Sequence, residues 1–210
     1  MNILVVGAHP DDIEIGCLGT ILSTKGSNNF YFFVCSSTPL RKQEFLASCE
    51  ALQNKGVSIL SVECLSHSDC DLFSRKSAIK DQLRKFEAKH KADFVLTHFK
   101  HDRHQDHRLV FEVTTEVCRN HNIFSYEIPK YDGCSFAPSV YEPISEGIAA
   151  EKVKHLMSYY ESQHTKNWYK TELFYAQLTL RGIEIKEKYA EAFIPVKVRM
   201  NNFCFSSKFL

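Results

Sequence analysis

The chain has 210 residues, of which 44% are hydrophobic and 24% are charged, and its formal net charge is +1. This size and composition are typical of one globular domain with a substantial core. Basic and acidic residues alternate, as in 75–91, which argues against nucleic acid as a partner. No run approaches the roughly 20 apolar residues that span a bilayer. Residues 1–8 lack a basic segment and a cleavage signal, so we expect a cytoplasmic protein.

Strand-like and helix-like segments alternate over the first 129 residues. We expect strands at 2–7, 30–35, 58–64, 93–99 and 124–128, and helices at about 12–24, 40–56, 74–90 and 107–121. Such alternation predicts a mostly parallel sheet with helices on both faces. The expected fold class is therefore α/β, a Rossmann-like three-layer α/β/α arrangement.

The pattern changes after Pro129. We expect irregular structure or short edge strands in 130–143, helices at 146–163 and 165–181, and a closing strand at 190–198. The chain is predicted to be a single domain, 1–210. In it, residues 1–129 form the doubly wound core and 130–210 form a small C-terminal cap that supplies part of the pocket wall.

The chain has eight cysteines, and none of them form a Cys-x-x-Cys pair. We interpret them as reduced and mostly buried, because nothing in the sequence indicates secretion. The spacing also argues against a zinc site built from cysteines.

Two polar runs stand directly after the expected first and fourth strands. They are Ala8-His9-Pro10-Asp11-Asp12 and His104-Gln105-Asp106-His107. Ligands of parallel α/β sheets bind at the carboxyl ends of the strands. We therefore expect both runs to contribute to one site.

The residue types in these runs match the needs of a catalytic metal ion. His9, Asp12 and His107 supply the three protein ligands typical of a catalytic zinc site, which keeps a position for water. Ferrous iron accepts the same donor set. Zinc lowers the pKa of a bound water to about 7. The pattern thus predicts metal-assisted hydrolysis of an acyl group.

The remaining polar residues of the runs suit proton transfer. Asp11 is the candidate general base. His104 is the candidate that stabilises an oxyanion or protonates a leaving amine, and Asp106 or Asp102 is expected to orient it.

Simpler interpretations exist for each residue taken alone. Asp11 or Asp12 could serve only as a helix N-cap, and His98 and His101 are expected to be solvated loop residues. The joint occurrence of both runs at strand ends favours a functional site over these interpretations.

The two runs resemble the signatures of the PIG-L (LmbE-like) family of metal-dependent N-deacetylases. The first matches the family's AHPDD motif, and residues 102–107 resemble its D-x-H-P-D-H motif with Gln105 in place of proline. Segments around 126–129, 154–163 and 189–193 resemble later signatures of the family. The resemblance therefore extends over nearly the whole chain.

The resemblance implies roles for eight residues. The implied metal ligands are His9, Asp12 and His107, the base is Asp11, the electrophile or acid is His104, its orienting partner is Asp106, and the sugar-hydroxyl contacts are Arg41 and Asp69. Arg41 could instead be a surface salt-bridge partner, and Asp69 a turn residue.

The function expected from residues and resemblance together is removal of the acetyl group from an N-acetylated amino sugar, of the N-acetylglucosamine type, or from its glycoconjugate. The expected cofactor is Zn²⁺. An amide hydrolase of the same fold acting on a different N-acyl group is the main alternative. A non-catalytic module that binds sugars or nucleotide sugars is the less favoured one.

The aromatic residues near the C-terminus bear on assembly. Phe193, Phe203, Phe205 and Phe209 could pack within the domain or against a second copy, as in a homo-oligomer. The expected partner is otherwise a small-molecule or glycoconjugate substrate.

Overall fold

A single seven-stranded sheet organises the computed structural model, which describes residues 1–130 and 136–199. Its order is β3-β2-β1-β4-β5-β7-β6. The strands are β1 Asn2–Gly7, β2 Asn29–Ser36, β3 Ser58–His67, β4 Phe94–Thr97, β5 Asn122–Tyr126, β6 Val140–Pro143 and β7 Ala190–Lys197. Strands β1 to β5 are parallel, whereas β7 runs antiparallel to β5 and β6.

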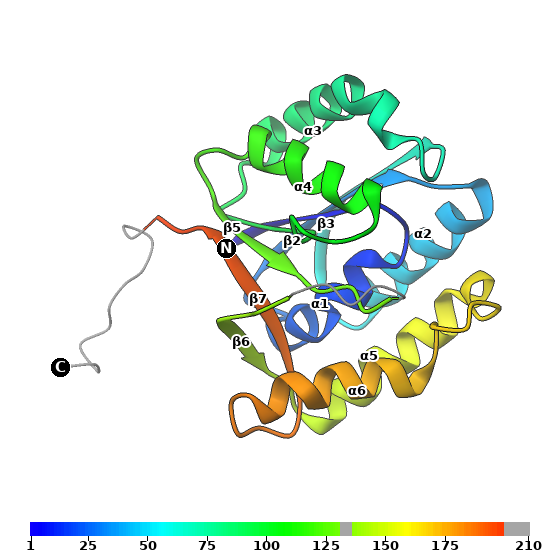
Figure 1. Ribbon diagram of the computed structural model, residues 1–210, viewed down its shortest axis with the longest axis vertical. Coiled ribbons are helices and arrows are strands. Elements are labelled where there is room, and N and C mark those ends of the chain that lie inside the picture. The colour runs from blue at the N-terminus through cyan, green and yellow to red at the C-terminus, as the bar shows by residue number, and fades with distance from the viewer. Residues whose placement is uncertain (131–135, 200–210) are drawn as a thin grey trace.

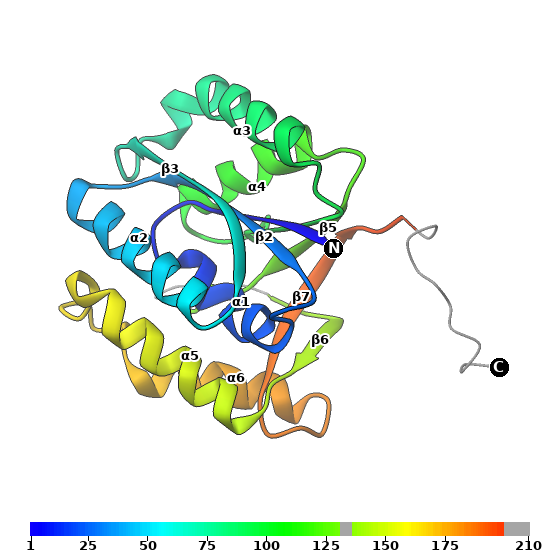
Figure 2. The same cartoon turned by 180° about the vertical axis from the view of Figure 1, so that it is seen from behind.

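Helices cover both faces of the sheet (Figures 1 and 2). They are α1 Asp12–Ser23, α2 Pro39–Asn54, α3 Lys76–His90, α4 Gln105–Val117, α5 Glu146–Tyr159 and α6 Thr171–Ile183, with short 3₁₀ turns η1 Leu72–Arg75 and η2 Glu161–Gln163. Apolar side chains of α3 and α4 pack on one face, and those of α1 and α2 on the other. The expected three-layer α/β/α class is confirmed.

The C-terminal third adds a further layer outside α1 and α2. Helix α5 packs on α1 and α2, while α6 packs on α5 and β7. Both β6 and β7 join the main sheet. Phe203, Phe205 and Phe209 lie outside the described residues, as do Cys134 and Cys204. No helix within 1–130 and 136–199 is long and apolar enough to cross a membrane.

Most helix boundaries differ from the sequence-based expectation by a few residues, and two of the differences have a clear structural cause. The helix expected at 107–121 runs from Gln105 to Val117, because the His104 side chain accepts a hydrogen bond from the Asp106 amide and starts it earlier. The helix expected at 165–181 begins at Thr171. Trp168 and Tyr169 are buried in the preceding loop, so their apolar character reflects core packing rather than helical periodicity.

Helix α1, which begins with Asp12, is kinked at Cys17, where φ is −151° and ψ is 18°. The kink leaves amide groups of the following turn without helical partners. The Glu191 carboxylate on β7 accepts hydrogen bonds from the amides of Gly19 and Thr20, both at 2.7 Å. A Cβ atom at Gly19 would lie 2.9 Å from this carboxyl carbon, so a larger residue would displace the carboxylate from its present position.

A buried lysine completes this junction. The Lys152 ammonium on α5 donates to Glu191 Oε1 at 2.6 Å and to the carbonyl of Ile15 at 2.7 Å. Both charged side chains are almost fully buried. The pair therefore ties α1, α5 and β7 together and fixes the helix that carries Asp12.

We predict that Lys152→Met lowers the free energy of unfolding by about 3–5 kcal/mol, because it leaves the Glu191 carboxylate buried without a counter-ion. Urea unfolding monitored by circular dichroism measures the change. Lys188→Met is the control, since Lys188 pairs with Glu146 at the exposed surface and its loss should leave the unfolding midpoint unchanged. Equal midpoints for both variants would contradict the structural role of the pair.

Candidate metal centre

The two polar runs lie side by side at the carboxyl ends of β1 and β4, which are neighbours in the sheet. His9 follows β1, and His104 and His107 stand at the start of α4. The ring centroid of His9 lies 4.9 Å from that of His104 and 5.4 Å from that of His107. The fold thus gathers imidazoles and carboxylates from residues about a hundred positions apart.

The two carboxylate oxygens of Asp12 have different surroundings. Oδ2 accepts hydrogen bonds from the amides of Ala8, at 3.1 Å, and His9, at 2.7 Å. His98 Nε2 lies 3.2 Å from the same oxygen. The Ala8 amide lies between two acceptors, because it also donates to His98 Nε2 at 2.9 Å. Oδ1 faces His107 Nε2 at 3.6 Å.

The His107 ring presents a lone pair to Asp12 Oδ1. Its Nδ1 lies 2.8 Å from Asp102 Oδ2. Nδ1 therefore carries the ring proton and donates a hydrogen bond to this carboxylate. Nε2 is buried and has no hydrogen-bond partner among the described residues. An unsatisfied nitrogen lone pair opposite a free carboxylate oxygen is the arrangement that a bound cation would satisfy.

The pKa shifts of this pair suit metal ligation. Burial alone would raise the pKa of the Asp12 carboxyl, but the imidazoles of His107 and His98 hold it well below its ordinary value. Burial lowers the pKa of His107. The pair is therefore a carboxylate and a neutral imidazole, which are the protonation states that bind zinc.

His9 lies between carboxylates. Its Nε2 is 2.9 Å from Asp69 Oδ1 and 3.2 Å from Asp106 Oδ2, and its Nδ1 is 3.4 Å from Asp12 Oδ2. Burial opposes protonation, but hydrogen bonds to Asp106, Asp12 and Asp69 raise the pKa of His9 well above its ordinary value. A metal ion bound to His9 would take the place of this proton.

Several residue groups could hold a metal ion. Within the described ranges, donor atoms lying within 4.8 Å of one another form four groups: His9/His104/His107, Asp12/His98/His107, His9/Asp69/Asp106 and Asp69/Cys70/His104. The predicted ligands His9 and His107 share one group, and Asp12 and His107 share another. His107 is therefore a member of both groups.

Asp11 adopts a left-handed backbone conformation, with φ of 105°, immediately before α1. This conformation is unusual for residues other than glycine, asparagine and aspartate. Asp11 Oδ2 lies 2.9 Å from Arg41 Nη2, and the same guanidinium donates to the Pro10 carbonyl. Burial raises the pKa of Asp11, while Arg41 opposes the shift. Arg41 therefore orients the candidate base, and its contact with a sugar stays a prediction.

His104 caps α4 through its Nδ1, which accepts the Asp106 amide at 3.3 Å. In the neutral ring the proton then lies on Nε2. The Asp106 carboxylate accepts from the Cys70 amide at 2.8 Å and contacts His9, and no hydrogen bond joins it to the His104 ring in the described part of the chain. Asp106 thus contacts His9 rather than the ring that the sequence suggested it would orient.

His98 was expected to be a solvated loop residue, and this expectation is wrong. Its side chain is 0% exposed, and its ring stacks on His107 with a centroid distance of 4.0 Å. The residue continues the buried run of β4 by one position beyond Thr97. That continuity was the available signal, because the first residue after a central parallel strand faces the ligand end of the sheet.

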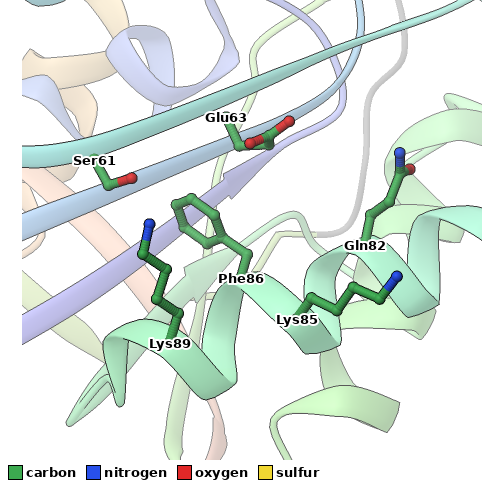
Figure 3. A pocket seen from close by; sticks show the side chains of 6 residues that line it. All are labelled: Ser61, Glu63, Gln82, Lys85, Phe86 and Lys89. Carbon is green, nitrogen blue, oxygen red and sulfur yellow. The ribbon is translucent and has the colours of Figure 1, made fainter.

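A separate pocket of about 270 Å³ lies between β3 and α3. Its lining residues are Ser61, Glu63, Gln82, Lys85, Phe86 and Lys89 (Figure 3). None of the predicted site residues is among them. This pocket is therefore distinct from the metal-ligating cluster.

Comparisons with known proteins place the chain in a family. A family model described as GlcNAc-PI de-N-acetylase (PIG-L) matches residues 4–118, which hold both polar runs. The uncharacterized deacetylase YaiS of Escherichia coli (strain K12) is 26% identical over 165 residues, covering 74% of this chain and 88% of that protein.

Solved structures show the same fold at lower identity. N,N′-diacetylchitobiose deacetylase from Pyrococcus horikoshii superposes with a TM-score of 0.74 and 18% identity, covering 100% of this chain and 88% of that one. GalB, the 4-carboxy-2-hydroxymuconate hydratase from Pseudomonas putida KT2440, gives a TM-score of 0.77 and 18% identity, covering 97% and 99%. Because one of these proteins is a hydratase, the fold alone does not determine the reaction.

We predict that Asp102→Asn weakens Zn²⁺ binding by about 10- to 100-fold, because it removes the charged acceptor that fixes the His107 ring. Competition with a chromophoric chelator measures the affinity. Asp71→Asn is the matched control, since Asp71 is an exposed carboxylate outside the metal-ligating groups. Unchanged affinity in Asp102→Asn would show that His107 is not a ligand.

Proposed function

Because the chain belongs to the PIG-L (GlcNAc-PI de-N-acetylase) family, we propose that it is a zinc-dependent hydrolase of N-acetylated amino sugars or their glycoconjugates. The proposed reaction removes the acetyl group by attack of water on the amide carbonyl. His9, Asp12 and His107 are the proposed metal ligands. Ferrous iron suits the same donors, so metal analysis of the purified protein accompanies every assay below.

One observation carries the proposal. The free Asp12 Oδ1 and the unsatisfied His107 Nε2 face each other across 3.6 Å, while every other polar atom of these two side chains has a partner. A zinc ion bound there would lower the pKa of a coordinated water and polarise the acyl carbonyl.

Asp11 is the proposed general base. Its carboxylate is buried next to Asp12, and the Arg41 guanidinium holds it in one orientation at 2.9 Å. Burial raises the pKa of Asp11, which makes the carboxylate a better proton acceptor than an exposed aspartate. In the proposed reaction it takes a proton from the attacking water.

His104 is the proposed electrophilic residue. Its Nδ1 is occupied by the Asp106 amide, so its Nε2 carries the proton that can be donated to the substrate. Donation to the acyl oxygen stabilises the negative charge that develops there, and transfer to the amine completes the departure of the product.

Asp69 is the proposed sugar contact. Its side chain is 56% exposed, unlike those of Asp12 and His107, and it lies beside His9 at 2.9 Å. A carboxylate at the entrance to the site can accept hydrogen bonds from sugar hydroxyl groups. We propose a cytoplasmic enzyme that acts on a small-molecule or glycoconjugate substrate.

Other functions predict different outcomes. A hydrolase of another N-acyl group would release formate or a longer acid instead of acetate. A sugar-binding module has no need for a buried carboxylate that is oriented by an arginine beside the candidate metal ligands. Its ligand affinity would also be insensitive to a chelator.

We predict that the zinc-loaded protein releases acetate from at least one member of a panel of N-acetylglucosamine derivatives, and that a chelator abolishes the release. A coupled acetate assay measures it, with N-formyl and N-propionyl analogues in parallel. Absence of acetate from every member would contradict N-deacetylation.

We predict that Asp11→Asn reduces kcat by about 100-fold or more, the usual scale for loss of a general base, while zinc content stays at the parent value. Asparagine tolerates the left-handed backbone of this position, so the fold should be preserved. Asp81→Asn, on the exposed face of α3, is the control and should retain full activity. Full activity of Asp11→Asn would rule out Asp11 as the base.

A further inference from the structure

One of the four donor groups lies at the solvent side of the centre. Single donor atoms of Asp69, Cys70 and His104 all lie within 4.8 Å of one another. Asp69 and Cys70 are exposed and His104 is half-buried, whereas Asp12 and His107 are buried. Solvent therefore reaches this outer group directly.

The outer group is held in place by the main chain of Cys70. The Cys70 amide donates to Asp106 Oδ2 at 2.8 Å, and its carbonyl accepts from Gln105 Nε2 at 2.6 Å. Cys70 has φ of 61°, in the left-handed region that favours glycine. Because both main-chain groups are bonded to the start of α4, the thiol is fixed next to Asp69, with Sγ 3.5 Å from Oδ1.

One contact of this arrangement depends on a residue that departs from the family motif. Gln105 occupies the motif position where proline is usual, and proline has no side-chain amide to donate to the Cys70 carbonyl. Cys70 is also the only exposed cysteine among the described residues, since Cys17, Cys35, Cys49, Cys64 and Cys118 are buried.

We propose that Asp69, Cys70 and His104 form a second metal site, which takes a thiophilic divalent cation of the Zn²⁺ type. Thiolate, imidazole and carboxylate are all zinc ligands, and a thiolate disfavours Mg²⁺ and Ca²⁺. On binding, the His104 proton moves from Nε2 to Nδ1, which releases the Asp106 amide and leaves the Nε2 lone pair for the cation. The Cys70 S–H bond breaks, its proton passes to solvent, and a metal–sulfur bond forms as a water leaves the cation. No oxidation or reduction is involved.

The consequence for activity rests on the proposed function. A cation bound to His104 withdraws the residue that donates a proton to the acyl oxygen, and a cation bound to Asp69 occupies the sugar contact. None of the inner ligands His9, Asp12 and His107 belongs to this group, although Asp69 Oδ1 lies 2.9 Å from His9 Nε2. The first equivalent of zinc would then support turnover, while excess zinc would inhibit it.

Cobalt titration of the metal-depleted full chain tests the site directly, because a thiolate bound to Co²⁺ gives an ultraviolet charge-transfer band. The first equivalent should give no such band, since the inner ligands are nitrogen and oxygen, and the second equivalent should produce it. Cys70→Ser should abolish the band. Absence of the band from the parent protein, or its persistence in Cys70→Ser, overturns the proposal.

Two further variants link the site to inhibition. Cys70→Ser should require about 10-fold more zinc for half-inhibition, with unchanged activity at one equivalent. Gln105→Pro should weaken the second site by about 10-fold, because it frees the Cys70 carbonyl while a helix start accepts proline. Asp71→Asn, next to the site, should behave as the parent protein. Equal zinc inhibition in all variants contradicts the inhibitory role.

The cobalt band separates this proposal from the proposed function. A cobalt band without any deacetylation would support the second site and contradict the proposed deacetylase function. Deacetylation without the band would support the proposed function and contradict the second site.

Discussion

The structure depends on how one buried carboxylate is satisfied. Asp12 directs Oδ2 to the amides of Ala8 and His9, with His98 Nε2 3.2 Å away, and leaves Oδ1 facing the lone pair of His107. Burial of an anion is costly unless opposite charge or hydrogen bonds compensate it. The donors compensate one oxygen, and the other oxygen is available to a cation.

The fold supplies this arrangement at a topological switch point. The chain passes from β1 to β2 on one side of the sheet and later returns to β4 on the other side, so the ends of β1 and β4 open between diverging connections. Helix α1 carries Asp12 and is fixed by the Glu191–Lys152 pair. Helix α4 carries His107, whose ring is fixed by Asp102. The candidate ligands Asp12 and His107 are therefore both held by buried polar contacts of the fold.

The sequence was sufficient to predict the layers and the convergence of the two runs, because alternating apolar segments define strand ends and parallel strands share one ligand edge. It was not sufficient for contacts that depend on side-chain rotamers. Arg41 pairs with Asp11, and Asp106 contacts His9, because of distances set by the folded chain. Periodicity also predicted too early a start for the helix near Trp168. Trp168 is buried in a loop, and its apolar character fits the spacing of a buried helix face.

The most direct test of the central claim is anomalous X-ray diffraction at the zinc edge from crystals of the zinc-loaded protein. The account predicts one strong peak at about 2.0–2.2 Å from Asp12 Oδ1, His107 Nε2 and a ring nitrogen of His9. A well-occupied peak that contacts neither Asp12 nor His107, or no peak in protein loaded with one equivalent of zinc, would contradict it.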